Sequence, residues 1–359
     1  MATRKKATLV LQNGRKMEGW AFGYDGPCDG EVVFSTAMVG YTESLTDPSY
    51  SGQILCATYP LLGNYGIARM DKDADGLLKS FESEKIYIRG LIVTDYSEEY
   101  RHWDAVESLG AWMAEQKVPG ISGIDTRLLT QILREEGSML GRIVPEGGDT
   151  DVFDVPDPNL ENQAVIVSCK EILRYGHGDK KVVLVDCGVK HQILRCLVHR
   201  GVEVIRVPWD YDFNQLEWDG LFISNGPGNP VHCQITVENI RRAMQTGKPI
   251  CGICLGNQLL GIAAGAKTYK LKYGHRSHNQ PVRQVGTDRC YITAPNHGYA
   301  LDESTLPADW EPYFTNMNDG TNEGIRHKSK PFFSAQFHPE ASSGPEDTEF
   351  IFDDFISLL

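Results

Sequence analysis

The stretch "GKPICGICLGNQLLG", residues 247–261, predicts a buried strand that turns directly into a helix. It contains Cys251 and Cys254 in a C-x-x-C spacing, which is typical of a dithiol redox pair at a helix N-terminus. The same letters contain Gly252-Ile-Cys254-Leu-Gly256, the thiol version of the G-x-S-x-G nucleophile elbow. There, small residues let strand and helix pack closely, and the helix N-terminus favours a thiolate and later an oxyanion. This stretch alone leaves both interpretations open.

Strand-like and helix-like runs alternate along the sequence after about residue 180. Such alternation favours a doubly wound, mostly parallel sheet, so we expect an α/β domain at residues 180–359. Ligands bind such sheets at the carboxyl ends of the strands, which is where Cys254 stands. The expected strands lie in segments 180–188, 202–208, 220–228 and 248–254, and the expected helices in 189–201, 237–247 and 257–266.

The first half of the sequence predicts a smaller, mixed α/β domain at residues 1–150. It opens with short strand-like runs, and Asn13-Gly14 between the first two is a strong hairpin signal. A segment rich in Pro, Gly, Asp and Asn follows the domain, and we interpret residues 151–179 as a linker. Helices are expected at 104–116 and at 125–137, the second capped by Asp125 or Thr126 and ended by Gly137.

The composition is that of a globular protein, with 41% apolar and 23% charged residues. The net charge of −13 argues against a nucleic-acid partner, because such binding depends on clustered Lys and Arg. No apolar stretch reaches 18 residues and the N-terminus lacks a signal-peptide pattern, so we expect no membrane contact and a cytoplasmic location. The nine cysteines are scattered and odd in number, which is typical of reduced core thiols.

Two further motifs bear on the choice between a redox pair and a nucleophile. His338 ends an apolar run in "FSAQFHPEAS" (333–342), and Glu340 stands two residues later, where it can accept the other N–H of the imidazole. A thiol nucleophile needs such an oriented base, whereas a dithiol couple does not. In "ISNGPGNP" (223–230), Gly226 and Gly228 follow a buried strand, so backbone N–H groups can approach an oxyanion. These motifs favour a nucleophile.

His275 and His278, in "YGHRSHNQP" (273–281), have a spacing that could suggest a metal pair. No third ligand stands out in the sequence, and zinc sites use at least three protein ligands. We therefore expect no metal in this chain.

The motifs "SNGPGNP", "GICLGNQ" and "HPE" occur in the order found in class I glutamine amidotransferases, and the C-terminal half resembles that family. The N-terminal half resembles the family of small, glutamine-hydrolysing subunits of carbamoyl-phosphate synthetases. Together the two resemblances cover nearly the whole chain. The stretches that carry the second one are "GEVVFSTAMVGYTESLTDPSYSGQI" (30–54), "GIDTRLLTQILREEG" (123–137) and "PNHGYAL" (295–301).

The resemblance implies a role for each site residue. Cys254 would be the nucleophile, His338 its base and Glu340 the carboxylate that orients the base. The reaction would be hydrolysis of the glutamine side-chain amide through a thioester at Cys254. The residues implied to hold the oxyanion and the glutamine are Ser49, Gly226, Gly228, Leu255, Gln258, Asn296, Gly298 and Tyr299.

The resemblance also implies a partner. Ammonia would pass through a tunnel to a large synthetase subunit, which makes carbamoyl phosphate from bicarbonate and ATP for pyrimidine and arginine synthesis. The 359 residues contain no GxxxxGK[ST] run, so we expect no cofactor here and place ATP and Mg²⁺ on the partner. The expected assembly is a heterodimer or a larger assembly of heterodimers.

Several positions depart from the family pattern. Cys251 stands at a usually apolar strand position, which makes the C-x-x-C spacing accidental. None of the departures touches the triad, but they bear on the shape of the glutamine pocket. The others are Asn257, Pro295, Ser343 and the "GHRSHNQP" segment.

Three alternatives remain beside this interpretation. The amidotransferase of a different synthase would share the C-terminal half only. A thiol-disulfide oxidoreductase would rest on Cys251 and Cys254 alone. A non-catalytic scaffold would be expected to lack Cys254 or His338, and both are present.

Overall fold

The computed structural model of the chain describes residues 5–359. The chain divides into two compact units, Met1–Leu160 and Glu161–Leu359. The division falls inside the segment that we expected to be a linker. Residues after Leu160 belong to the second unit because Ala164 is buried in its core and a short strand at Leu173–Tyr175 pairs with its sheet. The boundary at residue 160 therefore lies within the segment rich in Pro and Asp, about twenty residues before the expected start of the C-terminal domain.

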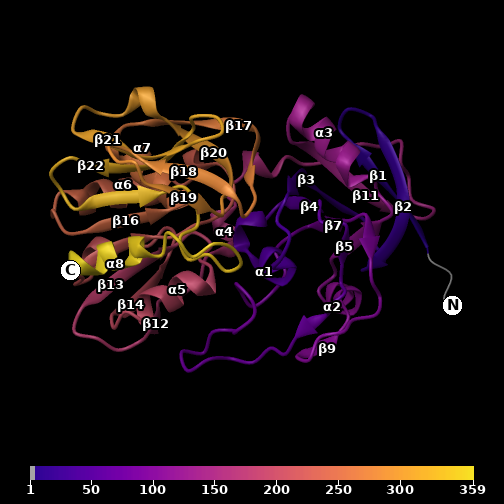
Figure 1. Cartoon of the computed structure of the whole chain (residues 1–359), viewed down its shortest axis with the longest axis horizontal. Coiled ribbons are helices and arrows are strands. Elements are labelled where there is room, and N and C mark those ends of the chain that lie inside the picture. The colour runs from indigo at the N-terminus through magenta and orange to yellow at the C-terminus, as the bar shows by residue number, and fades with distance from the viewer. Residues whose placement is uncertain (1–4) are drawn as a thin grey trace. The chain divides into compact units, whose positions relative to one another are not determined.

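Seven strands of the first unit form a closed barrel (Figure 1). Closure pairs β1 with β11 from the far end of the unit, with Leu9 opposite Ile143. A barrel leaves no unpaired sheet edge, so every strand can bury one face in the interior. In barrel order the strands are β1 (Lys6–Leu11), β11 (Met139–Pro145), β3 (Cys28–Ser35), β4 (Gln53–Ala57), β7 (Gly90–Ile92), β10 (Pro119–Ser122) and β2 (Lys16–Gly23).

Local sequence signals account for several elements of this unit. β1 and β2 form the expected antiparallel hairpin, and Gly14 adopts the left-handed φ of 83° that its turn requires. The side chain of Asp125 caps α3 by accepting from the Leu128 N–H at 2.8 Å, and Gly137 ends that helix. The remaining elements are the helices α1 (Tyr41–Thr46), α2 (Leu109–Glu115) and α3 (Thr126–Glu136), and the short pairs β5 (Leu61–Leu62) with β8 (Asp95–Tyr96) and β6 (Ile67–Ala68) with β9 (Ala105–Glu107).

The expected helix at 104–116 is shorter than predicted. It begins at Leu109 because the Ser108 side chain caps it, accepting from the Ala111 N–H at 3.2 Å. The residues before the cap pair with β6 as β9 instead. The sequence pattern therefore located the helix correctly but not its first turn.

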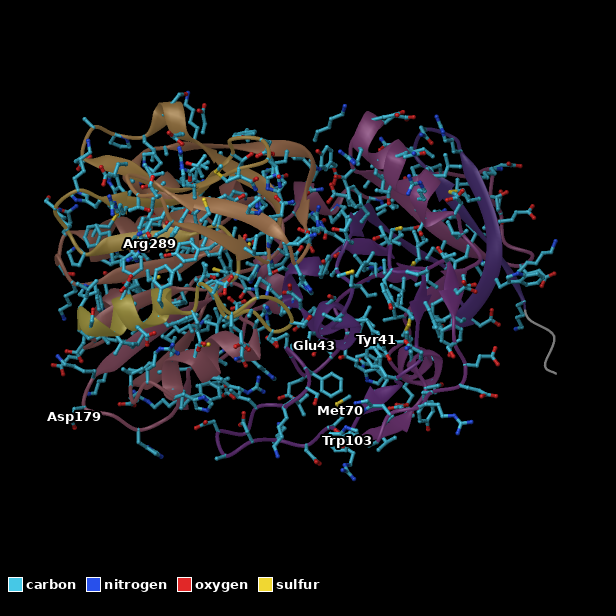
Figure 2. All side chains as sticks on the ribbon, in the orientation of Figure 1. Tyr41, Glu43, Met70, Trp103, Asp179 and Arg289 are labelled. Carbon is cyan, nitrogen blue, oxygen red and sulfur yellow. The ribbon has the colours of Figure 1, made fainter. Side chains whose placement is uncertain are left out.

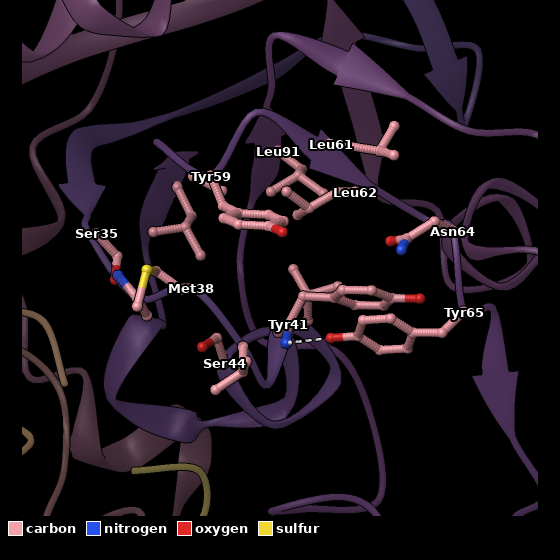
Figure 3. Close-up of a pocket in the computed structure, with 15 residues that line it drawn as sticks. Ser35, Met38, Tyr41, Ser44, Tyr59, Leu61, Leu62, Asn64, Tyr65 and Leu91 are labelled. Carbon is pink, nitrogen blue, oxygen red and sulfur yellow. Dashed lines mark hydrogen bonds between the residues drawn. The ribbon is translucent and has the colours of Figure 1, made fainter. Parts of the chain in front are cut away.

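An apolar pocket of about 160 Å³ opens in the first unit (Figure 3). The rings of Tyr41 and Tyr65 stack on one side of it with centroids 4.1 Å apart, and Tyr59 and Met38 lie across from them. None of the residues that line it is a carboxylate, a histidine or a cysteine. Among these lining residues, the only polar side-chain groups are serine and tyrosine hydroxyls and the Asn64 amide.

The second unit is built on a ten-stranded sheet with a parallel centre. Five neighbouring strands, β14, β13, β15, β16 and β23, run parallel, and antiparallel strands extend the sheet on both sides. This is the expected α/β fold. In sheet order the strands are β12 (Leu173–Tyr175), β14 (Glu203–Pro208), β13 (Lys181–Asp186), β15 (Gly220–Ile223), β16 (Ile250–Ile253), β23 (Phe332–Ala335), β22 (Asn322–His327), β21 (Trp310–Asn316), β18 (Gln280–Gln284) and β19 (Cys290–Thr293).

Helices cover both faces of the parallel strands (Figure 1). Ile223 and Ile250 pack with α6 and α7, whereas Phe222 stacks on Phe352 of α8. Charged side chains such as Asp179 and Arg289 stay at the surface, as Figure 2 shows. The helices are α4 (Ala164–Val167), α5 (His191–Val198), α6 (Gln234–Met244), α7 (Leu255–Ala264) and α8 (Phe350–Ser357).

A separate two-stranded antiparallel sheet pairs β17 (Lys267–Arg276), which follows α7, with β20 (Asn296–Asp302), and strands β18 and β19 of the main sheet lie between them in the sequence. Its register shifts between Lys270 and His275, so the strand bends before its last two pairs. The β17–β20 sheet carries residues of the candidate site, including Asn296 at the start of β20. Within residues 5–359, no helix is long and apolar enough to span a lipid bilayer.

Candidate active site

Cys254 lies at a tight turn between the end of β16 and the start of α7. Its backbone has φ 55° and ψ −104°, a strained conformation for a residue with a Cβ. A Cβ on Gly252 would lie 2.5 Å from the Gly256 carbonyl oxygen, and one on Gly256 would lie 2.1 Å from the Ile223 carbonyl oxygen. Both flanking residues must be glycine, which is the close packing that the elbow motif predicts.

Cys251 is separated from this turn by the sheet itself. Side chains alternate along a strand, and Ile250 packs with α7, so Cys251 points to the opposite face. Burial raises the pKa of the Cys251 thiol far above its usual range, and Asp354 of α8 raises it further. Both cysteines are free thiols. The C-x-x-C spacing therefore does not place two thiols together as a redox couple.

His338 and Glu340 follow the end of β23, the parallel neighbour of β16. The Nδ1 of His338 lies 2.6 Å from the Glu340 Oε1, and both side chains are buried. Burial lowers the pKa of His338, but the Glu340 carboxylate and the nearby Cys254 raise it to about 10. Among the described residues, the Nε2 of His338 has no hydrogen-bond partner, so it is available to the thiol or to a substrate.

Lys190, at the start of α5, is a member of this site that sequence reasoning missed. Its Nζ lies 3.0 Å from the same Oε1 of Glu340, and the pair is almost fully buried. Burial raises the pKa of Glu340, but Lys190 and His338 lower it to about 2. The carboxylate therefore stays charged at neutral pH. The only sequence signal was a lysine directly after the strand end "VVLVDCGV".

The glycine loop after β15 approaches the first turn of α7. A Cβ on Gly226 would lie 2.1 Å from the Cys187 carbonyl oxygen and 2.9 Å from the Leu255 side chain. Gly228 has a left-handed φ of 85°. The loop therefore packs against the side chain of Leu255, the first residue of α7.

The glutamine-binding segment expected at Asn296–Tyr299 forms the start of β20 beside the nucleophile. The Asn296 carbonyl oxygen lies 3.5 Å from the Cys254 Sγ. Gln258 of α7 donates from Nε2 to the Tyr299 carbonyl oxygen at 2.8 Å, so it holds the strand in place. Gly298 stands between them on the same strand. Ser49 belongs to the first unit, where its N–H donates to Asp47 at 2.9 Å, and its part in glutamine binding stays a prediction.

The departure at Asn257 is accommodated by a buried hydrogen-bond network. Asn257 donates to the Gln336 Oε1 at 2.9 Å and accepts from the Ser334 hydroxyl at 2.7 Å. Gln258 donates to the same Gln336 oxygen at 3.1 Å. An asparagine here links α7 to β23 and so fixes the two elements that carry the nucleophile and the base.

His275 and His278 do not form the pair that their spacing suggested. Burial, together with the charges of Lys190 and His338, lowers the pKa of His278 to about 4. His275 instead lies 3.3 Å from Glu323 and 2.8 Å from Asp319, with His297 opposite it on β20. His275, His297 and Glu323 are therefore three possible metal ligands that lie together, although the sequence spacing did not indicate this group.

Comparison with known families assigns both halves of the chain. The family model "Glutamine amidotransferase class-I" matches residues 183–358, and "Carbamoyl-phosphate synthase small chain, CPSase domain" matches residues 9–143. The chain belongs to the carbamoyl-phosphate synthase small-chain family. The N-terminal match excludes the alternative in which only the C-terminal half is shared with another synthase.

Curated relatives of this small-chain family differ in length. The chain is 51% identical to the carbamoyl phosphate synthase arginine-specific small chain of Neosartorya fischeri, over 99% of this chain and 80% of that protein. It is 50% identical to the mitochondrial carbamoyl-phosphate synthase [ammonia] of Mus musculus, over 99% of this chain but only 24% of that protein. The chain thus spans about a quarter of the mouse protein.

Two solved structures each align with about half of the chain. A putative GMP synthase component from Thermoplasma acidophilum is 27% identical, covers 51% of this chain and 94% of its own, and gives a TM-score of 0.44. A glutamine amidotransferase from Thermotoga maritima is 19% identical, covers 46% and 77%, and gives 0.38.

Proposed function

We propose that this chain hydrolyses the side-chain amide of glutamine and supplies the ammonia for carbamoyl phosphate synthesis. The observation that carries the proposal is the meeting of three groups at neighbouring parallel strands. Cys254 caps α7 after β16, and the buried His338–Glu340 pair, joined at 2.6 Å, follows β23. A thiol at a helix N-terminus with an oriented base is the arrangement of nucleophilic amide hydrolysis.

The reaction would proceed in two balanced steps. The Cys254 sulfur attacks the amide carbon while His338 takes the thiol proton. His338 then returns that proton to the leaving nitrogen, so ammonia departs and a thioester remains. Water, deprotonated by His338, attacks the thioester and releases glutamate and the free thiol. Glu340 keeps His338 oriented and stabilises the imidazolium in both steps.

Backbone and polar groups around Cys254 would hold the substrate. The N–H groups of Gly226 and Leu255 are the proposed oxyanion donors, with Gly228 in the same loop, and the contact between Gly226 and the Leu255 side chain supports this. The amino-acid end of glutamine needs polar partners rather than a large pocket. The groups proposed for it are Gln258, Asn296, Gly298 and Tyr299, together with Ser49 of the first unit.

The synthetase chemistry is proposed to lie on a partner chain. The chain covers 80% of a fungal protein named as a small chain but only 24% of a mouse protein named carbamoyl-phosphate synthase [ammonia]. We propose that a large subunit binds ATP and Mg²⁺, uses bicarbonate, and pairs with this chain as a heterodimer or a larger assembly.

The test is Cys254→Ser in a complex with the large subunit. Serine keeps the size but lacks the thiolate, so we expect carbamoyl phosphate output from glutamine to fall about a thousand-fold or more. Output from ammonium salt should be unchanged, because it needs no thioester. The measurement is carbamoyl phosphate formed with each nitrogen donor, on complexes shown to contain both chains.

The matched control is Cys251→Ser, three residues away on the other face of the sheet. We expect it to retain glutamine-dependent synthesis and to lose about 1–3 kcal/mol of stability, because its buried hydroxyl would lack a partner. Loss of ammonia-dependent synthesis in the Cys254→Ser complex would contradict the proposed division of labour. Loss of glutamine-dependent synthesis in Cys251→Ser at unchanged stability would restore the dithiol alternative.

A further inference from the structure

We propose that His275, His297 and Glu323 form a binding site for a divalent transition-metal ion, best suited to Zn²⁺, where the paired strands β17 and β20 meet β22. The three residues come from β17, β20 and β22, and all are buried. One ligand atom from each lies within 4.8 Å of the other two. The proposal does not depend on the amide hydrolysis proposed above.

The separations of the donor atoms are close to those of a metal site. His275 of β17 and His297 of β20 are directly opposite each other in the antiparallel pair. The Glu323 Oε1 lies 3.3 Å from the His275 Nδ1 and 3.9 Å from the His297 Nε2. Bonds of about 2.0–2.1 Å to a tetrahedral zinc place neighbouring ligand atoms roughly 3.3 Å apart. The longer of these two edges needs a contraction of less than one ångström to reach that separation, and the third edge, between the two imidazole nitrogens, is no longer than 4.8 Å.

The second nitrogen of each histidine already has the partner that metal-binding histidines use. The His275 Nε2 lies 2.8 Å from the Asp319 Oδ2, and the His297 Nδ1 lies 2.9 Å from the Tyr299 carbonyl oxygen. Such acceptors fix the tautomer, so the opposite nitrogen offers its lone pair to a metal. Here both opposite nitrogens face Glu323.

Two buried atoms at the centre of this cluster have no hydrogen-bond partner within residues 5–359. They are the His297 Nε2 and the Glu323 Oε2, on side chains that are each 1% exposed. Leaving such groups unpaired is costly, and at 3.9 Å from Oε1 the imidazole cannot form a normal hydrogen bond with the carboxylate. A metal ion would bind both atoms at once.

The ligand types select the ion. Two imidazoles and one carboxylate form the His₂Glu set of zinc sites that keep an open fourth position, and the same ligand types also hold Fe²⁺, whereas Mg²⁺ and Ca²⁺ prefer oxygen ligands only. The Asp319 side chain is 44% exposed and contacts His275, so solvent comes within one side chain of the cluster. The competing arrangement is a proton on His275 held between Asp319 and Glu323 with no metal.

The experiment uses the full chain without any added histidine tag. The protein is dialysed against a chelator and titrated with Zn²⁺, with Mg²⁺ and Ca²⁺ as controls, and bound metal is counted by elemental analysis. Co²⁺ is then substituted, because its visible absorption reports tetrahedral nitrogen and oxygen ligands. All titrations are repeated in the Cys254→Ser background, so that metal bound by the active-site thiol is recognised.

Three variants and one control locate the ion. We expect Glu323→Gln and His297→Gln to weaken Zn²⁺ binding at least about 100-fold, and Asp319→Asn, which is half exposed, by about 10–100-fold. The control is His327→Gln, because His327 lies 3.1 Å from Asp309 in an ordinary histidine–carboxylate pair. It should bind Zn²⁺ as the unmodified chain does.

The expected result is one Zn²⁺ per chain, a tetrahedral Co²⁺ spectrum, and loss of both in the ligand variants. Absence of stoichiometric Zn²⁺ in the Cys254→Ser protein would overturn the proposal and leave the protonated His275 arrangement. Binding that survives both Glu323→Gln and Asp319→Asn would also overturn it, and Asp319→Asn keeps the test valid if a buried substitution prevents folding.

Discussion

Lys190 shares one carboxylate oxygen with the catalytic base. The Glu340 Oε1 accepts from Lys190 at 3.0 Å and from His338 at 2.6 Å, in a region closed to solvent. Two buried cationic partners keep this carboxylate charged. The carboxylate in turn orients the His338 imidazole and stabilises its protonated form, which agrees with the raised pKa of that group. Lys190 therefore acts on the chemistry through Glu340 and is a positioning residue.

We expect Lys190→Met to destabilise the chain by about 3–5 kcal/mol, because it leaves a buried carboxylate short of a partner. The control is Lys72→Met in the first unit, which removes an exposed pair with Glu84 at 3.2 Å and should cost about 1 kcal/mol or less. Urea unfolding at neutral pH measures both. Equal losses in the two variants would contradict a buried, coupled role for Lys190.

The same pair sets the response to acid. The pKa of Glu340 is lowered to about 2, so its stabilisation is complete above its ordinary pKa and is lost as the pH falls through about 2. Without Lys190 the folded pKa rises, so Lys190→Met should begin to lose stability at a higher pH than the unmodified chain. Repeating the urea series at falling pH tests this sign.

At the scale of elements, the turn between β16 and α7 depends on two helix-strand contacts without side chains. A Cβ on Gly256 would meet the Ile223 backbone at 2.1 Å, and that strand cannot move without disturbing the sheet centre. We expect Gly256→Ala to cost about 1–3 kcal/mol by overpacking and to displace Cys254, so glutamine hydrolysis falls with stability.

Gly261 offers a matched control on the same helix. A Cβ there would meet the Leu301 side chain at 2.4 Å and not a backbone atom, and a side chain can adjust more easily than a strand. Alanine also favours a helix over glycine by about 1 kcal/mol, so Gly261→Ala should cost less stability than Gly256→Ala. Thermal unfolding and glutaminase rates of the two variants decide whether the backbone contact or helix propensity matters.

Elements with strong local signals were predictable from the sequence. Short sequence patterns predicted three features correctly: the Asn13-Gly14 turn, the Asp125 cap and the alternation of strands and helices after residue 180. Barrel closure was not predictable, because β1 pairs with β11 across more than a hundred residues and no local pattern encodes that partner. The His275–His297 pair could not be predicted for the same reason, because β18 and β19 of the main sheet lie between its two strands in the sequence.

At the scale of the whole molecule, each unit has its own core, and the boundary lies near residue 160. A fragment of residues 161–359 retains α4 and the edge strand β12, whereas a fragment of residues 180–359 loses both and exposes β14. We expect the longer fragment to be the more stable by several degrees in Tm and the less prone to aggregate. Thermal unfolding of the two fragments is the measurement, and equal Tm values would restore the linker interpretation.

The left-handed backbone of Cys254 has an evolutionary consequence. A φ of 55° with a side chain present carries strain of about 1–3 kcal/mol, which glycine at the same position would relieve. Selection for thermal robustness and selection for amide hydrolysis therefore oppose each other at this codon. In a lineage that relied on free ammonia, replacement of Cys254 by glycine would make the protein more stable. The same replacement would end glutamine use, and that loss would be difficult to reverse.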